Sequence, residues 1–212
     1  MEHRLRGGRG SAAERRPGCA EFVLAAPDLV SARAVEQNRA MTLLSRDQIE
    51  AALAALDEEL GRAGERASLY LVGGAVMCLV LKARETTKDV DAWFEGAGAV
   101  RAAAKRVASS LGLPDDWLND AAKAFVPPNA HFETWRSLGN VEILVADTRT
   151  LFAMKCAAAR SEEDAGDIRT LARVLRLQSS AEALEIVLRY YPAERLPVRT
   201  RLLLEELLDD GT

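Results

Sequence analysis

Hydrophobic residues recur at helical spacing from Ser45 onward. Ser45 and Gln48 have the spacing of a capping box, in which the serine side chain and the glutamine side chain satisfy each other's backbone N–H groups. The apolar residues that follow at helical intervals are Ile49, Leu53, Leu56 and Leu60. Two glycines, Gly61 and Gly64, then end the pattern. The sequence therefore predicts an amphipathic helix that begins near Ser45 and ends at these glycines.

Short apolar runs and helical patterns alternate between residues 68 and 146. Strands are predicted for SLYLVGG, TKDVDAWF, HFETW and NVEILVA, the last two close to a hairpin. Helices are predicted for AVMCLVLKAR, VRAAAKRVASSL and LPDDWLNDAAKAF. From Asp147 onward the pattern is helical, with a second capping box at Ser179 and Glu182. The predicted class is α+β: a small mixed sheet with flanking helices over residues 41–147, followed by a helical C-terminal part, residues 148–212, packed on that core.

The first forty residues follow neither pattern. They are rich in arginine and glycine and lack the apolar region of a secretory signal. Three interpretations compete: a disordered basic tail that touches RNA, a short targeting arm, or sequence upstream of a translation start at Met41. The third is favoured over a start at Met1, because helical order is predicted immediately after Met41.

Composition narrows the class of protein. Of the 212 residues 49% are hydrophobic, and the formal net charge of -4 argues against a generically basic coat for nucleic acid. No apolar run approaches the roughly 18 residues that cross a bilayer. The 3 cysteines have no CxxC spacing, which favours a reducing cytoplasm, and 2 histidines are too few for a histidine-rich metal site.

Gly73 and Gly74 lie between a predicted strand and a predicted helix. Glycines let backbone N–H groups approach a ligand closely, and a helix N-terminus adds positive potential, so this turn suits a phosphate. A Gly-Gly pair also ends many strands, so the pair alone favours a structural role.

Asp89 and Asp91 are two positions apart on the next predicted strand. Residues i and i+2 of a strand point to the same face, with Cα atoms roughly 6.5 Å apart. Two such carboxylates, together with phosphate oxygens, suit Mg²⁺. The alternative is an acidic pair that keeps an edge strand soluble. The apolar flanks Val90, Trp93 and Phe94 favour a buried strand, where paired acids are costly without a cation.

The order strand, Gly-Gly, helix and Asp-hydrophobic-Asp resembles the nucleotidyltransferase superfamily related to DNA polymerase beta. The segment RETTKDVDAWF is similar to the bacterial branch that contains the AbiEii-type abortive-infection toxins, and Arg84 and Thr87 match its pattern. Ala75 departs from the pattern, because many members have serine there and use its hydroxyl on a phosphate. The resemblance implies a nucleotidyltransferase-like fold, with Gly73, Gly74, Arg84 and Thr87 at the nucleotide.

A second match lies in LFAMKCAAARSEEDAGDIRTL, which resembles the branch's lysine-bearing helix and the Arg-x-x-Asp-x-x-Asp-type segment after it. Lys155, Arg160, Asp164 and Asp167 take the corresponding positions, although the spacing from arginine to aspartate is longer here. The resemblance assigns Lys155 to the nucleotide phosphates and Asp167 to the active site. From the residues alone, Lys155 is either a half-buried lysine with an anionic partner or a snorkelling surface lysine. The two aspartates suit a solvent-facing helix start.

Superfamily members usually carry a third carboxylate on another strand. Glu142 in NVEILVA is the candidate for this third metal ligand. An outward-facing polar strand residue explains Glu142 equally well, so both interpretations stay open.

The sequence leads to the hypothesis of a Mg²⁺- or Mn²⁺-dependent nucleotidyltransferase that moves a nucleoside monophosphate from an NTP to an acceptor hydroxyl. Asp89, Asp91, Lys155 and Asp167 form its expected catalytic set. The resemblance implies the 3′ end of tRNA as acceptor, and a toxin paired with a cognate antitoxin; arginines should then gather on one face. One alternative is a small-molecule, antibiotic-modifying nucleotidyltransferase, with an acid-lined acceptor pocket and no basic face. The other is a noncatalytic binding protein that keeps the fold.

Overall fold

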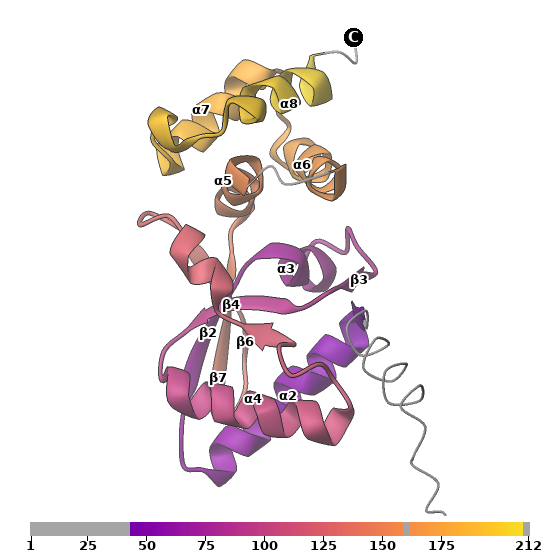
Figure 1. Ribbon diagram of the computed structural model, residues 1–212, viewed down its shortest axis with the longest axis vertical. Coiled ribbons are helices and arrows are strands. Elements are labelled where there is room, and N and C mark those ends of the chain that lie inside the picture. Colours follow the sequence, from indigo (N-terminus) through magenta and orange to yellow (C-terminus); the bar gives the residue numbers. More distant parts are fainter. Residues whose placement is uncertain (1–42, 159–161, 210–212) are drawn as a thin grey trace, which may run out of the picture.

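The computed structural model describes residues 43–158 and 162–209 (Figure 1). The predicted tail of residues 1–40, the choice between Met1 and Met41, and Arg160 lie outside these residues. Within them the chain is a mixed α+β structure built on a mixed sheet, as the sequence predicts.

Helix α2 (Arg46–Arg62) begins where the capping box predicts. The Ser45 side chain accepts the backbone N–H of Gln48, and the Gln48 side chain accepts that of Ser45 at 2.9 Å. The apolar residues of the predicted stripe are all buried: Ile49, Leu53, Leu56 and Leu60. One face of α2 therefore supplies part of the hydrophobic core.

The main sheet has the strand order β5-β4-β2-β7-β6. Its central strand β2 (Ala67–Leu71) is antiparallel to β4 (Val90–Phe94) and parallel to β7 (Val141–Ala146). The outermost strands are β5 (Leu118–Asn119), which is parallel to β4, and β6 (Phe132–Ser137), which is antiparallel to β7. The pair of β6 and β7 is the predicted hairpin. A separate antiparallel pair joins β1 (Leu44–Ser45) to β3 (Thr86–Thr87).

Three strand ends meet along one border of this sheet, the border that runs across the strands, and this border is called the edge of the sheet below. Leu71, the last residue of β2, pairs with Ala92 on β4 and with Val145 on β7. Because β7 runs parallel to β2 and β4 runs against it, the ends of β2 and β7 lie beside the start of β4. Helix α3 (Gly73–Leu79) leaves the sheet from β2 at this edge, and helix α5 (Thr148–Ala158) leaves it from β7.

The two faces of the sheet differ. Helices α2 and α4 (Ala97–Leu111) pack together and cover one face, which is buried and apolar (Figure 1). The other face carries Tyr70, which stacks on Trp93 at 4.5 Å between ring centroids and meets Phe132 edge-on at 5.2 Å. Asp91 lies on this second face, because it is two positions from Trp93 along β4.

The prediction of one helix over LPDDWLNDAAKAF is wrong. The segment forms β5 and then a short 3₁₀ helix, η1 (Ala121–Phe125). Trp117 is fully buried, and its indole N–H donates to the carbonyl of Ala104 at 3.0 Å. The carbonyl of Trp117 accepts the backbone N–H of Val90. These tertiary contacts outweigh a weak helical preference.

The helices described after Asp147 stack beyond the edge of the sheet where α5 begins (Figure 1). Helix α5 packs on α6 (Glu162–Leu175) and α7 (Ser180–Tyr190), and α7 packs on α8 (Val198–Leu208). A short 3₁₀ helix, η2 (Ala193–Arg195), joins α7 to α8. None of the helices in the described ranges has the length and apolar character needed to span a membrane.

Candidate functional site

The Gly73–Gly74 turn requires glycine at both positions. Gly73 has a φ of +67°, and a Cβ there would lie 2.9 Å from Asp91 Oδ2. A Cβ on Gly74 would overlap the hydroxyl oxygen of Thr87. The first glycine therefore lets the start of α3 approach the aspartate, and the second lets it approach the buried Thr87.

The two predicted metal carboxylates occupy the edge described above. Asp89 immediately precedes β4, and Asp91 is its second residue. The side-chain N–H of Asn119 donates to Asp89 Oδ2 at 2.8 Å, because β5 pairs Asn119 with Asp91. Burial raises the pKa of the Asp89 carboxyl, although the Asn119 hydrogen bond acts in the opposite direction. Asn119 thus holds a half-buried carboxylate in place.

Lys155 belongs to a buried ionic cluster that joins α5, α6 and the loop after α3. Its ammonium donates to Asp164 Oδ1 at 2.8 Å and lies 2.9 Å from Asp167 Oδ2. The contact with Asp167 Oδ2 is an ion pair without hydrogen-bond geometry, since this buried oxygen accepts no hydrogen bond from the described residues. Asp167 Oδ1 accepts the Nε–H of Arg84 at 2.7 Å. The side chain of Lys155 is 14% exposed and that of Asp167 4% exposed, so the partnered interpretation of Lys155 is right and the snorkelling one is wrong.

The expectation of solvent-facing acids at the start of α6 is also wrong. Asp164 is buried at 8% exposure and Asp167 at 3%. Both turn inward because each faces the ammonium of Lys155, which offsets the cost of burying a carboxylate.

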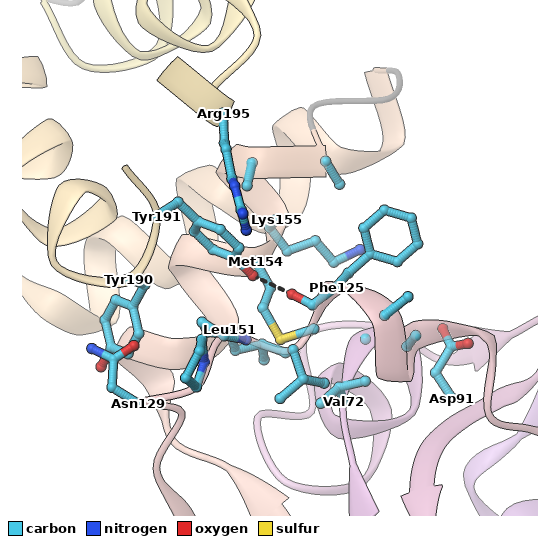
Figure 2. A pocket seen from close by; sticks show the side chains of 18 of the residues that line it. Val72, Asp91, Phe125, Asn129, Leu151, Met154, Lys155, Tyr190, Tyr191 and Arg195 are labelled. Carbon is cyan, nitrogen blue, oxygen red and sulfur yellow. Dashed lines mark hydrogen bonds between the residues drawn. The ribbon is translucent and has the colours of Figure 1, made fainter. Parts of the chain in front are cut away.

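A cleft of about 850 Å³ lies between the edge of the sheet and the C-terminal helices (Figure 2). This volume is within the roughly 300–1,000 Å³ of ligand pockets. Its walls come from the glycine turn, β4, η1 and the prolines after it, one face of α5, and the end of α7. Among the residues that line it are Gly73, Asp91, Phe125, Asn129, Leu151, Met154, Lys155, Asp164, Tyr190, Tyr191 and Arg195.

Two hydrogen bonds hold the wall of η1 against the end of α7. The hydroxyl of Tyr191 donates to the carbonyl of Phe125 at 2.6 Å (Figure 2). The side-chain amide of Asn129 donates to the carbonyl of Arg189 at 2.9 Å. Burial raises the pKa of Tyr191 to about 12, so its hydroxyl stays a neutral donor at physiological pH. The cleft is therefore bracketed between segments far apart in the sequence.

The structure brings three of the predicted site residues to the cleft. Gly73, Asp91 and Lys155 line the cleft itself. The others do not line it. Arg84 pairs with Asp167, which lies behind Lys155; Gly74 and Thr87 lie against each other; and Asp89 is held by Asn119 just before β4. Thr87 is buried against Gly74, which gives it a packing contact with the turn.

Glu142 is not brought to the site. It pairs with Ser68, three positions back along β7 from Val145, which is roughly 10 Å from the edge that carries the aspartates. It is exposed, and the hydroxyl of Thr134 lies 3.4 Å from its carboxylate. The geometry favours the outward-facing polar interpretation of Glu142.

Several residues of the cleft, and Asn119 near it, escaped the sequence patterns. Asn119 was missed because the segment around it resembles a helix, and only pairing with β4 places it at Asp89. Phe125, Tyr191 and Arg195 carry no motif spacing. The sequence signal that could have indicated these residues is the presence of Pro127, Pro128 and aromatic residues in loops that are otherwise polar. That signal does not identify a ligand.

The edge of the sheet that carries Asp89 and Asp91 offers carboxylate oxygens, the ligand type that hard divalent cations take. Within the described ranges, no three His, Cys, Asp or Glu side chains gather closely enough to hold a metal ion. Asp89 and Asp91 would supply two carboxylates on one face, and the missing Cβ of Gly73 leaves room for close approach beside Asp91 Oδ2. Magnesium is commonly bound in this way, through one or two carboxylates completed by phosphate oxygens and water.

Comparison of the chain with models of protein families, with curated proteins and with solved structures finds no match. The geometry of the cleft is therefore the basis on which a function can be inferred.

Proposed function

We propose that this protein is a magnesium-dependent nucleotidyltransferase with the corresponding fold, which transfers a nucleoside monophosphate from an NTP to an acceptor hydroxyl. The single observation that supports this proposal is the meeting of three features at one cleft. The glycine turn at the N-terminus of α3, Asp91 with Asp89 two positions before it along the chain, and the ion-paired Lys155 come from three separate segments.

Each feature has a part in such a reaction. The backbone N–H groups of the Gly73–Gly74 turn and the ammonium of Lys155 would bind phosphate oxygens. Asp89 and Asp91 would hold Mg²⁺ or Mn²⁺, which would make the acceptor hydroxyl a better nucleophile and would stabilise negative charge on the phosphoryl group. The acceptor oxygen bonds to the α-phosphorus, its proton leaves to solvent, and the bond to the pyrophosphate oxygen breaks.

Asp167 contributes through its neighbours. It is buried in contact with Lys155 and Arg84, and it does not line the cleft. We therefore assign Asp167 the role of a positioning residue that fixes Lys155, rather than that of a proton acceptor.

A basic stripe supports a polynucleotide acceptor such as the 3′ end of tRNA. Arg169 and Arg173 lie four residues apart on α6 and so share one face of the helix, and Arg176 directly follows the last residue of α6, Leu175. All three are exposed, and none forms an ion pair with another residue of the described chain. A small-molecule acceptor needs no such stripe, whereas RNA phosphates do. The proposal extends to a toxin that an antitoxin restrains.

Labelling of RNA tests the proposal. The protein is incubated with each α-labelled NTP, Mg²⁺ and total tRNA, alongside Asp91→Asn and the exposed control Glu58→Gln. Wild type and Glu58→Gln should label tRNA with one NTP. Labelling by Asp91→Asn should be at least a hundredfold lower, because the substitution removes a metal ligand. Equal labelling by wild type and Asp91→Asn would contradict the mechanism. Label on a small hydroxylated compound instead would move the acceptor to the antibiotic-modifying class.

A further inference from the structure

Two acidic and two basic side chains line the described cleft, and only one of the two basic ones is paired with a carboxylate. Of its described lining residues, Asp91 and Asp164 are acidic, and Lys155 and Arg195 are the basic ones. Lys155 is already matched by Asp164 and by Asp167 behind it. Arg195 is therefore the cation of the cleft wall whose charge no carboxylate of the described residues neutralises.

Arg195 extends into the cleft from a fixed backbone. Figure 2 shows its side chain pointing from η2 down into the cavity. Its own backbone N–H donates to the carbonyl of Pro192, and the next residue, Leu196, packs against the core. The neighbouring Tyr191 is tied to Phe125 by its hydroxyl. The start and end of η2 are thus anchored, while Arg195 is an exposed residue.

This arrangement suits a phosphate. Arginine carries five N–H donors in a planar fork that matches phosphate oxygens, and it stays charged at any physiological pH. A structural salt bridge would explain an arginine at this position, but the part of the chain that the structure describes offers Arg195 no carboxylate within ion-pair distance.

We infer that Arg195 binds the phosphate chain of the nucleotide, as a second cationic anchor beside Lys155. The inference rests on the proposed function, because it takes a nucleoside triphosphate as the ligand of this cleft. The triphosphate carries more negative charge than the partly neutralised Lys155 can balance. Arg195 supplies the missing charge from the wall that faces α5, and it does so without a carboxylate that must first be displaced.

Calorimetry with inorganic tripolyphosphate and Mg²⁺ tests this role without requiring turnover. The full chain is compared with Arg195→Gln and with Arg201→Gln, a matched control that removes the same charge from an exposed position on α8 outside the cleft. A charge-assisted hydrogen bond at an exposed group implies a loss of affinity on the order of tenfold for Arg195→Gln. Arg201→Gln should bind like wild type, and Arg195→Lys should recover part of the loss. The same series is run with an NTP.

The outcomes separate the two proposals. Tenfold weaker binding in Arg195→Gln alone supports the inference. Equal weakening in both glutamine variants reduces the effect to general electrostatics and overturns it. Unchanged binding in Arg195→Gln, while wild type binds both tripolyphosphate and NTP, overturns the role of Arg195 and leaves the proposed function standing. Failure of wild type to bind either ligand overturns both.

Discussion

Replacing Asp167 by Asn should destabilise the protein through the buried ionic cluster. The substitution keeps the size of the side chain and removes one negative charge that faces two cations, Arg84 at 2.7 Å and Lys155 at 2.9 Å. Breaking a buried ion pair by removing one partner costs about 3–5 kcal/mol when the remaining charge has no other partner.

The expected loss is smaller here for two structural reasons. Lys155 keeps Asp164 as a partner at 2.8 Å, and the side chain of Arg84 is 25% exposed, so water screens part of its charge. We therefore expect a loss of about 2 kcal/mol in the free energy of unfolding. For a chain of this size, that corresponds to a fall of roughly 4–8 °C in Tm.

Calorimetry and urea unfolding at pH 7 measure this loss. The control is Glu58→Gln, whose carboxylate is 72% exposed and lies 3.6 Å from Arg62. An exposed pair of this kind contributes about 0–1 kcal/mol, so the control should barely move. The double variant Asp164→Asn/Asp167→Asn should lose more than the sum of the single variants, because only together do they leave Lys155 without a carboxylate. A change below about 1 °C in Asp167→Asn would refute the reasoning, because it would mean that the cluster contributes no net stability.

Three further substitutions test other parts of the structure by their unfolding free energies. Gly74→Ala should destabilise by roughly 1–3 kcal/mol through overlap with Thr87, and adding Thr87→Ala should restore part of that loss; no recovery would place the strain elsewhere. Arg176→Gly should raise Tm, because Arg176 follows the last residue of α6 at a φ of +57° that glycine adopts at about 1 kcal/mol less cost; a fall in Tm would contradict this. Tyr191→Phe should lose about 1 kcal/mol with its hydrogen bond to Phe125. Since burial raises the pKa of Tyr191 to about 12 from its usual 10, the stabilisation from its neutral hydroxyl is complete below pH 10 and declines as the pH rises through 12. Tyr191→Phe should not show this part of the loss of stability at alkaline pH. If the variant lost stability with pH as the wild type does, the assignment of this loss to Tyr191 would be wrong.

The parts of the fold that the sequence predicts well are those fixed by neighbouring residues. The capping box at Ser45 depends on a residue three positions away, and the Gly73–Gly74 turn depends on the strand just before it. Asp91 is near in sequence as well, and its meeting with Gly73 needs only that β4 pair antiparallel with β2. Short-range patterns carry enough information for such features.

The parts that the sequence misplaces depend on distant contacts. The residues around Asn119 have a helical pattern and do not reveal that Asn119 pairs with β4. The residues around Asp164 do not reveal that its side chain faces Lys155. Glu142 is a residue that the sequence assigned to the site and the structure places away from it. Its position on a strand matches the motif, but the sequence does not reveal how far along that strand the site lies. Register and the docking of helices decide these cases, and both are set by the whole core.

The cleft joins the two segments that the sequence divides at residue 147. Asp91 comes from β4 and Gly73 from the start of α3, whereas Lys155 and Asp164 come from the helices after residue 147. The hydrophobic core is continuous across this division, since buried residues of β2, α5, α6 and α8 belong to one cluster. The pair between Arg84 and Asp167 crosses it as well. A change that loosened the packing of α6 would therefore alter both the stability of the protein and the position of Lys155. Variants of the contact between Arg84 and Asp167 should thus lose stability and nucleotide binding together. Variants of Arg195 should lose nucleotide binding and keep their stability.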